Sequence, residues 1–486
     1  MDKSSVIFGN VMKESDVKSA RSKQQSFINK YGDDRQKVYH LKAEDNSVVG
    51  EDSLGVKVLK LSDKPLEIDK DKSIIIGNIR MGFGHYRISM AIASAAHSMG
   101  YTPYWFDLNS FEGTTATKII SAQNDLYSLG SRISQKSVVF NKAVWEPMNS
   151  EGFRKLTYNC SDQAVSELMT GLFRDLPKDI PFAATHVWPA QAAIHAGLTK
   201  VVNVVPDNWP MALHLAEGAI HTVQTESAYL GYKMLRGMDK TRTLRPMPDE
   251  DIAFTGHYID HELVSNIEAD CARRIKRLDE GKAKRYLLTI GGAGAQQDIF
   301  VSIIRQLLKQ VRRNKASLLI NLGDHLDAWE AIKQKLPELS ALTTEHLDNF
   351  EETKAFAEAA LDGDICGVHA FCHKDIFAAV YSTNLLMRCC DVLITKPSEL
   401  AFYPVPKLMI KRVGGHEAWG AVRAAEIGDG TYECSSIREI CGTLAVMQRE
   451  DSVIRFLCES IIRNKERGIY NGAYRAVELA FKGRTI

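Results

Sequence analysis

Short, continuously apolar runs alternate along the chain with segments in which apolar residues recur every three or four positions. The run Ser73–Ile79 is typical of a strand that is buried on both faces, as in a parallel sheet. The segment Ile88–Met99 carries its apolar residues on one helical face and is followed by Gly100, a common helix stop. Another apolar run, Tyr101–Leu108, follows at once. This strand–turn–helix–strand order predicts the opening of a doubly wound α/β domain.

The same order recurs in the second half of the chain. Arg285–Ile290 predicts a strand and Gly291–Gly294 a glycine-rich turn. Ile299–Val311 predicts a helix and Ser317–Leu322 the next strand. Two openings of one kind predict two Rossmann-like, doubly wound domains that face a shared cleft, each with a glycine-rich turn toward it.

Changes in polarity suggest where these domains begin and end. The segment before residue 73 is rich in charge and contains one expected strand, Val56–Leu61. Glu262–Gly281 has the pattern of a strongly charged surface helix. The predicted division is a polar N-terminal extension over 1–72, a first Rossmann-like domain over 73–260, a helical linker over 261–284, a second Rossmann-like domain over 285–450 and C-terminal helices over 451–486.

Composition excludes several classes of protein. The 486 residues carry a formal net charge of +1, which disfavours a nucleic-acid binder, and 45% are hydrophobic, which disfavours disorder. No apolar run is long enough for a membrane span, and no apolar segment follows Met1–Ser5 as in a signal peptide. The 9 cysteines form no CxxC pair. We therefore expect a reduced, cytoplasmic protein. The basic pair Lys411 and Arg412 is a candidate for contact with a membrane surface, but solvated surface charges are the favoured interpretation.

The first glycine-rich turn carries the strongest candidate chemistry. Gly82 and Gly84 allow close backbone approach, and the helix that follows would favour an anion such as a phosphate. Arg87 stands where the dinucleotide fingerprint has its third glycine, which disfavours a nicotinamide cofactor. His85 at the start of the helix is a candidate general base. A tight turn with an exposed or capping histidine is the alternative.

A second candidate follows the apolar strand Val201–Val204. Asp207 would lie at the carboxyl end of this strand, where open α/β sheets bind ligands, and could orient a hydroxyl or accept its proton. His214 follows seven residues later. The alternative is a loop aspartate that caps the next helix.

The segment Cys366–His373 is crowded with cysteine and histidine, which raises the question of zinc. Its C-x2-H-x2-C-H spacing is not that of a usual structural zinc site, and no second ligand cluster accompanies it. We therefore expect no metal, and a loop that leads into a helix. The chain also lacks a GxSxG elbow and a Walker motif, which disfavours a serine hydrolase and an ATPase.

Three segments together resemble one family. They are Gly82–His85, Thr255–Tyr258 and Cys390–Pro397, the last of which resembles the "aDvlITKpGG…tEa" segment of GT-B glycosyltransferases. The branch that it resembles contains the monogalactosyldiacylglycerol synthases and the peptidoglycan GlcNAc transferase. Asp207–Glu226 is similar to a "TD…H…W…" segment of the synthases. The resemblance covers roughly residues 73 to 450, and its motifs are specific only in combination.

The resemblance implies a GT-B fold whose first domain binds an acceptor and whose second binds a nucleotide sugar, usually a UDP-sugar. Gly292 and Gly294 would approach the diphosphate, and Glu399, beside Lys396, would hold the ribose hydroxyls. The other residues that it assigns to substrates are His85 and Asp207 for catalysis and Gly82, Gly84, His214, His416 and Glu417 for binding, the last two at the donor sugar.

The implied activity is an inverting, metal-independent sugar transfer, with the UDP-sugar as co-substrate and no cofactor. Relatives use lipid or lipid-linked acceptors. Two departures fall in the donor pocket: Ser398 leads directly to Glu399, which shortens a glycine-rich loop, and Gly420 lies near the place of a family asparagine. Two alternatives therefore stay open, a non-hydrolysing UDP-sugar 2-epimerase and an inactive relative that binds a nucleotide or a partner.

Overall fold

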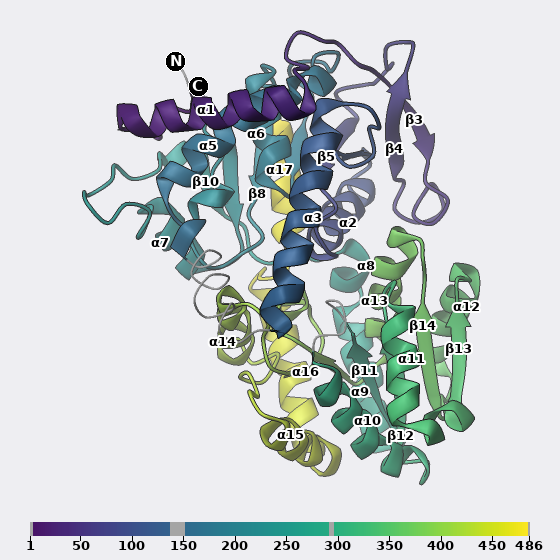
Figure 1. The fold of residues 1–486 in the computed structure, drawn as a ribbon. Coiled ribbons are helices and arrows are strands. Elements are labelled where there is room, and N and C mark those ends of the chain that lie inside the picture. Colours follow the sequence, from purple (N-terminus) through teal and green to yellow (C-terminus); the bar gives the residue numbers. More distant parts are fainter. Residues whose placement is uncertain (1–2, 137–150, 291–295, 485–486) are drawn as a thin grey trace. The chain divides into compact units, whose positions relative to one another are not determined.

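The computed structural model describes residues 3–136, 151–290 and 296–484. They form two compact units, of which unit 1 is Met1–Asp260 with Asn471–Ile486 and unit 2 is His261–Tyr470 (Figure 1). Each unit holds a largely parallel sheet with helices, so the predicted α/β fold with two Rossmann-like domains is confirmed. Within the described ranges, no helix combines the length and apolar character needed to cross a bilayer.

Unit 1 is built on an eight-stranded sheet in the order β10-β9-β8-β7-β5-β6-β4-β3. Only β3 and β4 pair antiparallel, and Ile76 at the centre of the sheet pairs with Trp105 and Ala183. The central strands are buried on both faces, as their continuous apolar runs predict. The strands are β3 (His40–Asp45), β4 (Lys57–Ser62), β5 (Ser73–Asn78), β6 (Thr102–Asp107), β7 (Phe182–Ala184), β8 (Val201–Val204), β9 (Ile220–Val223) and β10 (Ile252–Phe254), besides a small hairpin of β1 (Val6–Ile7) and β2 (Asn10–Val11).

The last helix of the chain belongs to unit 1. The ring of Phe481 stacks on Tyr101 with centroids 3.8 Å apart, and the Gly472 amide donates to the His257 carbonyl at 2.9 Å. A side chain on Gly472 would lie 2.2 Å from the Gly256 carbonyl oxygen, so only glycine permits this approach. The helices of unit 1 are α1 (Glu14–Tyr31), α2 (Gly84–Ser98), α3 (Thr115–Lys136), α5 (Leu156–Ser166), α6 (Val187–His195), α7 (Glu226–Lys233) and α17 (Gly472–Lys482), with short 3-10 turns at Glu167–Phe173, Ala212–His214 and Asp249–Asp251.

Residues 1–72 are more than the polar extension that the sequence predicts. Strand β4 pairs with β6 and extends the central sheet, and its Leu59 is fully buried in the core with Leu41 of β3. Helix α1 lies along α5 and is fixed by polar contacts, because Arg21 pairs with Glu167 at 2.7 Å. The charged pattern was misleading because this segment exposes polar residues on one side while its few apolar side chains complete the core.

Unit 2 contains a six-stranded, fully parallel sheet in the order β13-β14-β12-β11-β15-β16. Leu287 of β11 pairs with Leu319 and Leu393 on its two sides. The strands are β11 (Lys284–Thr289), β12 (Ala316–Asn321), β13 (Thr343–Leu347), β14 (Val368–Cys372), β15 (Val392–Thr395) and β16 (Lys407–Met409). The helices are α8 (His261–Ser265), α9 (Ile267–Asp279), α10 (Gln297–Val311), α11 (Leu326–Lys335), α12 (Phe350–Asp362), α13 (Ile376–Cys389), α14 (Ala418–Glu426), α15 (Ile437–Arg449) and α16 (Asp451–Glu466), with 3-10 turns η6 (Pro337–Leu342), η7 (Glu399–Phe402) and η8 (Gly415–Glu417).

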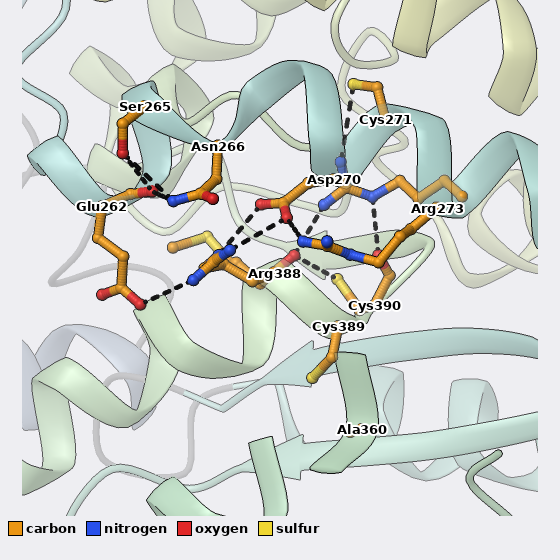
Figure 2. A network of polar contacts seen from close by, with 12 residues as sticks. Glu262, Ser265, Asn266, Asp270, Cys271, Arg273, Ala360, Arg388, Cys389 and Cys390 are labelled. Atoms are coloured by element: carbon orange, nitrogen blue, oxygen red, sulfur yellow. Dashed lines mark hydrogen bonds and ion pairs between the residues drawn. The ribbon is translucent and has the colours of Figure 1, made fainter. Parts of the chain in front are cut away.

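The segment predicted as a linker, 261–284, is an integral part of unit 2. Arg388 of α13 pairs with Glu262 of α8 at 3.2 Å and with Asp270 of α9 at 3.3 Å, as Figure 2 shows. The fully buried Arg274 donates to the carbonyl oxygens of Met387 and Cys390, both at 2.8 Å. Several of the charges that suggested a surface linker therefore attach these helices to α13.

Two other expectations also differ from the structure. The segment Cys366–His373 is not a loop, because Val368–Cys372 forms strand β14 inside the sheet. His369 lies in this strand and hydrogen-bonds His346 of β13 across 3.1 Å, so a polar residue is accommodated by a neighbouring strand. The C-terminal helices predicted over 451–486 do form, but α16 belongs to unit 2 and α17 to unit 1.

Candidate functional site

The carboxyl ends of β5 and β7 form the topological switch point of unit 1. From β5 the chain crosses through α2 to β6 on one side, while β7 pairs with the other edge of β5. Open α/β sheets bind ligands at such a point, because the loops that follow the two strands turn away from each other. Here these loops are the turn that ends at Gly84 and the residue pair Thr185–His186.

The turn after β5 combines a special backbone with an open surface. Gly82 has φ +73°, and a side chain built on it would meet no atom within 4 Å. Glycine is thus favoured here by conformation alone and not by crowding. Gly84 begins α2, and Arg87 in its first turns is buried, 6% exposed. The predicted glycine-rich turn therefore exists, and it leaves room beside the backbone at Gly82.

His85 has a defined orientation. Its Nδ1 lies 2.7 Å from the Thr185 carbonyl oxygen, and a carbonyl can only accept, so Nδ1 carries the proton. In the neutral ring Nε2 then carries the lone pair. Thr185 itself is held by its amide, which donates to the Gly77 carbonyl at 2.9 Å, and by a hydroxyl contact of 2.8 Å with Ser89. His85 is thus arranged as a base through Nε2.

Asp207 and His214, which lie close together in the sequence, are also in contact in the structure. The Nε2 atom of His214 lies 3.0 Å from a carboxylate oxygen of Asp207, whose side chain is 30% exposed. His214 is buried, and its carbonyl accepts from Asn203 at 2.6 Å. The alternative role for Asp207 was to cap the next helix, but the turn Ala212–His214 has Met211 as its N-cap and no side-chain cap, and the Asp207 carboxylate contacts His214.

Two side chains from α7 and its preceding turn hold the loop that carries Asp207. Gln224 donates to the Pro206 carbonyl at 2.8 Å, and the hydroxyl of Tyr232 donates to the Trp209 carbonyl at 3.1 Å. A side chain on Gly231 of α7 would come within 2.9 Å of Pro210. This close packing fixes the loop, so Asp207 and His214 occupy defined positions beside the switch point.

His186 belongs to the same cluster and was not predicted from the sequence. It is the N-cap of α6, and its Nδ1 accepts the Trp188 amide at 3.2 Å. Its ring lies 4.9 Å from the ring of His85, edge to face. Burial lowers the pKa of His186 well below the usual range, and the nearby His85 and His214 add to this effect. A three-residue strand followed by a helix with Pro189 in its first turn was the available signal.

The carboxyl end of β6 adds a buried carboxyl group. Asp107 accepts a hydrogen bond from the hydroxyl of Tyr86, and burial raises the pKa of Asp107. Asn78, the last residue of β5, is fully buried, and neither polar atom of its side chain has a hydrogen-bond partner among the described residues. The carboxyl end of β5 therefore holds a buried amide whose hydrogen-bonding capacity is unused.

In unit 2 the switch point lies between β11 and β15. The hydroxyl of Thr289 at the end of β11 donates to that of Thr395 at the end of β15 across 2.8 Å. Gly292 and Gly294, predicted to approach a diphosphate, lie outside the described residues. Gln296, which precedes α10, has φ 73°, a left-handed conformation that is unusual for a residue with a side chain.

The donor residues predicted after β15 have different surroundings. Lys396 forms an ion pair with Glu417, whose other oxygen accepts the amides of Val413 at 2.8 Å and Gly414 at 3.1 Å. Glu417 therefore holds its own loop in place. Glu399 begins η7 and is partly exposed, and no hydrogen bond or ion pair joins its carboxylate to another described residue. For His416 the structure describes only the backbone, within η8.

Gly420, one of the departures from the motif that the sequence resembles, lies in a closely packed part of α14. A side chain at this position in α14 would lie 2.7 Å from the Pro397 carbonyl oxygen and 3.1 Å from Ala401. Glycine lets α14 pack directly on η7, which carries Glu399. The turn that bears Glu399 is thus supported by this close contact with α14.

The structure thus brings His85, Asp207 and His214 into one cluster with His186 in unit 1, and joins Lys396 to Glu417 in unit 2. Within unit 2, no ion pair joins Glu399 to Lys396 among the described residues. Across the described parts of the chain, no three or more His, Cys, Asp or Glu side chains are grouped so that they could hold a metal ion.

Two sequence families match the chain, and both are described only as domains of unknown function. Residues 6–234 match DUF6937 and residues 247–481 match DUF6938. The boundary between the two families lies within unit 1, before β10, and not at Asp260. No curated protein matches the chain.

Solved structures with some similarity are enzymes that share little sequence with this chain. UDP-GlcNAc 2-epimerase from Neisseria meningitidis, bound to UDP-GlcNAc, is 13% identical, with a TM-score of 0.43 over 85% of this chain and 100% of its own. An α,α-trehalose 6-phosphate synthase from Burkholderia multivorans is 11% identical, with a TM-score of 0.43 over 85% of this chain and 98% of its own. A glycosyltransferase from Rickettsia africae is 10% identical, with a TM-score of 0.37 over 83% and 95%.

Proposed function

We propose that this protein transfers a sugar from a nucleotide sugar, a UDP-sugar in the first place, to an acceptor hydroxyl with inversion. The observation that carries the proposal is that each doubly wound unit has titratable side chains at or beside its own switch point, which we propose as the reactive and ligand-binding groups. In unit 1 these are His85 and the Asp207–His214 pair, and in unit 2 the carboxylate of Glu399 after β15. The motif resemblance to GT-B glycosyltransferases assigns the acceptor to unit 1 and the nucleotide to unit 2.

His85 is the proposed general base. Its Nε2 would take the proton of the acceptor hydroxyl while the hydroxyl oxygen bonds to the anomeric carbon of the sugar. The bond from that carbon to the diphosphate oxygen breaks, and the nucleoside diphosphate leaves with the electron pair. Asp207, held by His214, would orient the acceptor through a second hydroxyl.

Unit 2 would hold the donor. Glu399 would accept hydrogen bonds from the ribose hydroxyls, while the N-terminus of the fifteen-residue helix α10 would favour the diphosphate. Lys396 and Glu417 would maintain the adjoining loop, which the motif resemblance assigns to the donor sugar with His416. In this scheme helix termini offset the charge of the leaving group, so the proposal includes no metal and no cofactor.

The acceptor class follows only from the resemblance. Monogalactosyldiacylglycerol synthases and the peptidoglycan GlcNAc transferase use lipid or lipid-linked acceptors, so we propose an acceptor at a membrane surface reached from the cytoplasm. A UDP-sugar 2-epimerase is the second candidate, because three histidines and a carboxylate gather in unit 1 and could act as acid and base on one substrate. An epimerase would need no acceptor, so product analysis separates the two.

A thermal-shift panel tests the proposal. UDP, GDP, dTDP, ADP and NAD are compared on the wild type, on Glu399→Ala and on the control Glu459→Ala, whose side chain is exposed on α16. A ligand that binds only the folded state raises the Tm with occupancy. We expect UDP to stabilise the wild type and the control, and Glu399→Ala to lose this stabilisation. The absence of any nucleotide effect would remove both sugar-nucleotide candidates and leave the inactive relative.

A further inference from the structure

Two histidines at the edge of the unit 2 sheet take part in a continuous chain of hydrogen bonds. The Nε2 atom of His346 in β13 lies 3.1 Å from the Nδ1 atom of His369 in β14. The Nδ1 atom of His346 lies 2.8 Å from a carboxylate oxygen of Glu352 in α12. The Nε2 atom of His369 lies 3.1 Å from the carbonyl oxygen of Cys366. We call these four groups the imidazole chain, which joins α12 to the turn before β14 across the edge strand β13.

Each of the three contacts in the imidazole chain needs one proton. A carbonyl oxygen only accepts, so the Nε2 atom of His369 carries a proton. The contact between the two rings needs a second proton, on one of the two nitrogens that face each other. An ionised carboxylate also only accepts, so the Nδ1 atom of His346 carries the third. Two neutral imidazoles hold two protons between them, so the complete chain holds one proton more.

The surroundings place this additional proton on His346. Its ring stacks on Phe371 with centroids 4.5 Å and planes 7° apart, and the face of an aromatic ring favours a cation. The residue is 5% exposed, and Glu352 supplies the opposite charge. Burial lowers the pKa of His369, and the nearby His346 contributes to this shift. A charged His346 beside a neutral His369 therefore satisfies the whole chain.

The start of α12 orients Glu352 toward His346. Asn349, the N-cap, accepts the Glu352 amide at 3.1 Å, and its side-chain amide donates to the second carboxylate oxygen of Glu352 at 3.3 Å. The N-terminus of this thirteen-residue helix favours a negative charge in its first turn. The titratable groups that act on His346 are thus Glu352 from α12, His369 from β14 and, after β14, His373, whose pKa is lowered by burial and also by His346.

We propose that the imidazole chain is a pH-sensitive latch on the edge of the unit 2 sheet. With the additional proton, all three hydrogen bonds form, and His346 links α12 and β14 through β13. When this proton leaves as the pH rises, two protons remain for three contacts, and one hydrogen bond is lost. Strand β13 has a neighbouring strand on one side only, so this loss acts on the least supported strand of the sheet.

Ring-nitrogen NMR of the full chain, labelled with ¹⁵N at histidine, tests the proton count. The two rings are assigned by the loss of their signals in His346→Gln and in His369→Gln. At about pH 6 we expect His346 to be protonated on both nitrogens and His369 on Nε2 alone, whereas two independent histidines would both be largely charged. At about pH 8.5 we expect two protons on the pair. Two charged or two neutral rings at pH 6, or three protons at pH 8.5, would overturn the proposal.

Matched variants of α12 test the effect on β13. In Glu352→Gln the side-chain amide donates to the Nδ1 atom of His346, so that two neutral rings satisfy all three contacts. Glu351→Gln is the control, because it removes the same charge from an exposed position in the same turn. Backbone hydrogen exchange over Thr343–Leu347 is compared with that of the wild type at equal pH, so that intrinsic exchange rates cancel.

We expect the wild type to be better protected than Glu352→Gln at about pH 6 and less well protected at about pH 8.5. The ratio of the two exchange rates should change by at least threefold, as the loss of one hydrogen bond implies. The corresponding ratio for Glu351→Gln should be the same at both pH values. A constant ratio for Glu352→Gln, or an equal change in Glu351→Gln, contradicts the latch.

If Glu352→Gln fails to fold, the protonation of the two wild-type rings still decides. The inference goes beyond the proposed sugar transfer, because the imidazole chain contains none of the residues proposed for the donor or the acceptor. A failed nucleotide test at Glu399 would leave the latch in place, and a failed latch would leave the proposed transfer in place.

Discussion

The imidazole Nε2 of His214 lies 3.0 Å from the carboxylate of Asp207, and the two residues close a loop that begins at the carboxyl end of β8. A buried ring thus holds a partly exposed carboxylate beside the other histidines of unit 1. Because the carboxylate retains contact with solvent, the pair adds little stability, about 1 kcal/mol or less. Its position beside the switch point, at the carboxyl end of β8, is better explained by a role in orienting a ligand.

We therefore predict that Asp207→Asn separates activity from stability. The amide keeps the size of the side chain but loses the negative charge, so the Tm should change by no more than in Asp249→Asn. Asp249 is a suitable control because it forms an exposed ion pair with Lys233 at 2.6 Å. Sugar transfer, measured as nucleoside diphosphate release, should fall by about 10- to 100-fold in Asp207→Asn alone. Equal activity in the two variants would remove Asp207 from the site.

A second prediction concerns the packing of Gly420 in α14 against η7, the turn that carries Glu399. Gly420→Ala would place a methyl group 2.7 Å from the Pro397 carbonyl oxygen, and the resulting shift should cost about 1–3 kcal/mol of unfolding free energy. The control is Gly442→Ala in the exposed face of α15, where a methyl group meets no atom within 4 Å and should stabilise by up to about 1 kcal/mol. Denaturant unfolding measures both. Similar effects of the two substitutions would mean that α14 can move away from η7.

We predict that the buried carboxyl group of Asp162 in α5 makes the stability of the protein depend on pH. Burial raises the pKa of Asp162 to about 6, so the folded state takes up its proton at a higher pH than the unfolded state. This carboxyl group therefore costs no stability below about pH 4, and the cost grows to roughly 2–3 kcal/mol as the pH rises through 6. Asp162→Asn should raise the Tm at pH 7.5 and have little effect at pH 4. A variant that is less stable at both values would contradict the assignment.

We predict that replacing the buried Asn78 by an apolar residue raises the stability of the protein. Since neither polar atom of this buried side chain has a partner in the described structure, Asn78→Leu, of similar size, should raise the free energy of unfolding by about 1–3 kcal/mol. The control is Asn159→Leu, which removes hydrogen bonds to the carbonyls of Ala212 at 2.8 Å and Leu215 at 2.7 Å and should destabilise. A loss of stability in both variants would contradict the prediction that the Asn78 amide is an unpaired buried group.

Strands in the centre of each sheet were predictable, because their burial on both faces leaves a continuous apolar run. Val201–Val204 was predicted to the residue, and Ser73–Ile79 differs from β5 by one position. Strand β14 was not predicted, since His369 and Cys372 interrupt its pattern and their neighbours come from another strand. The contribution of 57–62 to the first sheet was missed because it depends on pairing with β6, far along the chain.

The candidate site, like the sheets, could be predicted only where a residue follows a strand with a clear apolar pattern. His85 and Asp207 follow continuous apolar runs, so their places at the carboxyl ends of strands could be derived from the sequence. His186 follows a strand of three residues, too short for periodicity to reveal. Its protonation depends on a backbone amide of α6 and on two histidines from other loops, none of which is visible in the local sequence.

The return of α17 to unit 1 makes unit 2 an insertion that is joined to unit 1 at both ends, after Asp260 and before Asn471. On the ribosome, unit 2 can complete its sheet before the residues that finish unit 1 have been synthesised. A stop codon shortly after Tyr470 would therefore leave unit 2 complete. It would remove α17 from unit 1, although most of unit 1 is synthesised before unit 2. Because α17 packs against α2 and against the strands β5, β7 and β8, we expect such a truncated chain to lose the histidine cluster although every one of its residues is still present.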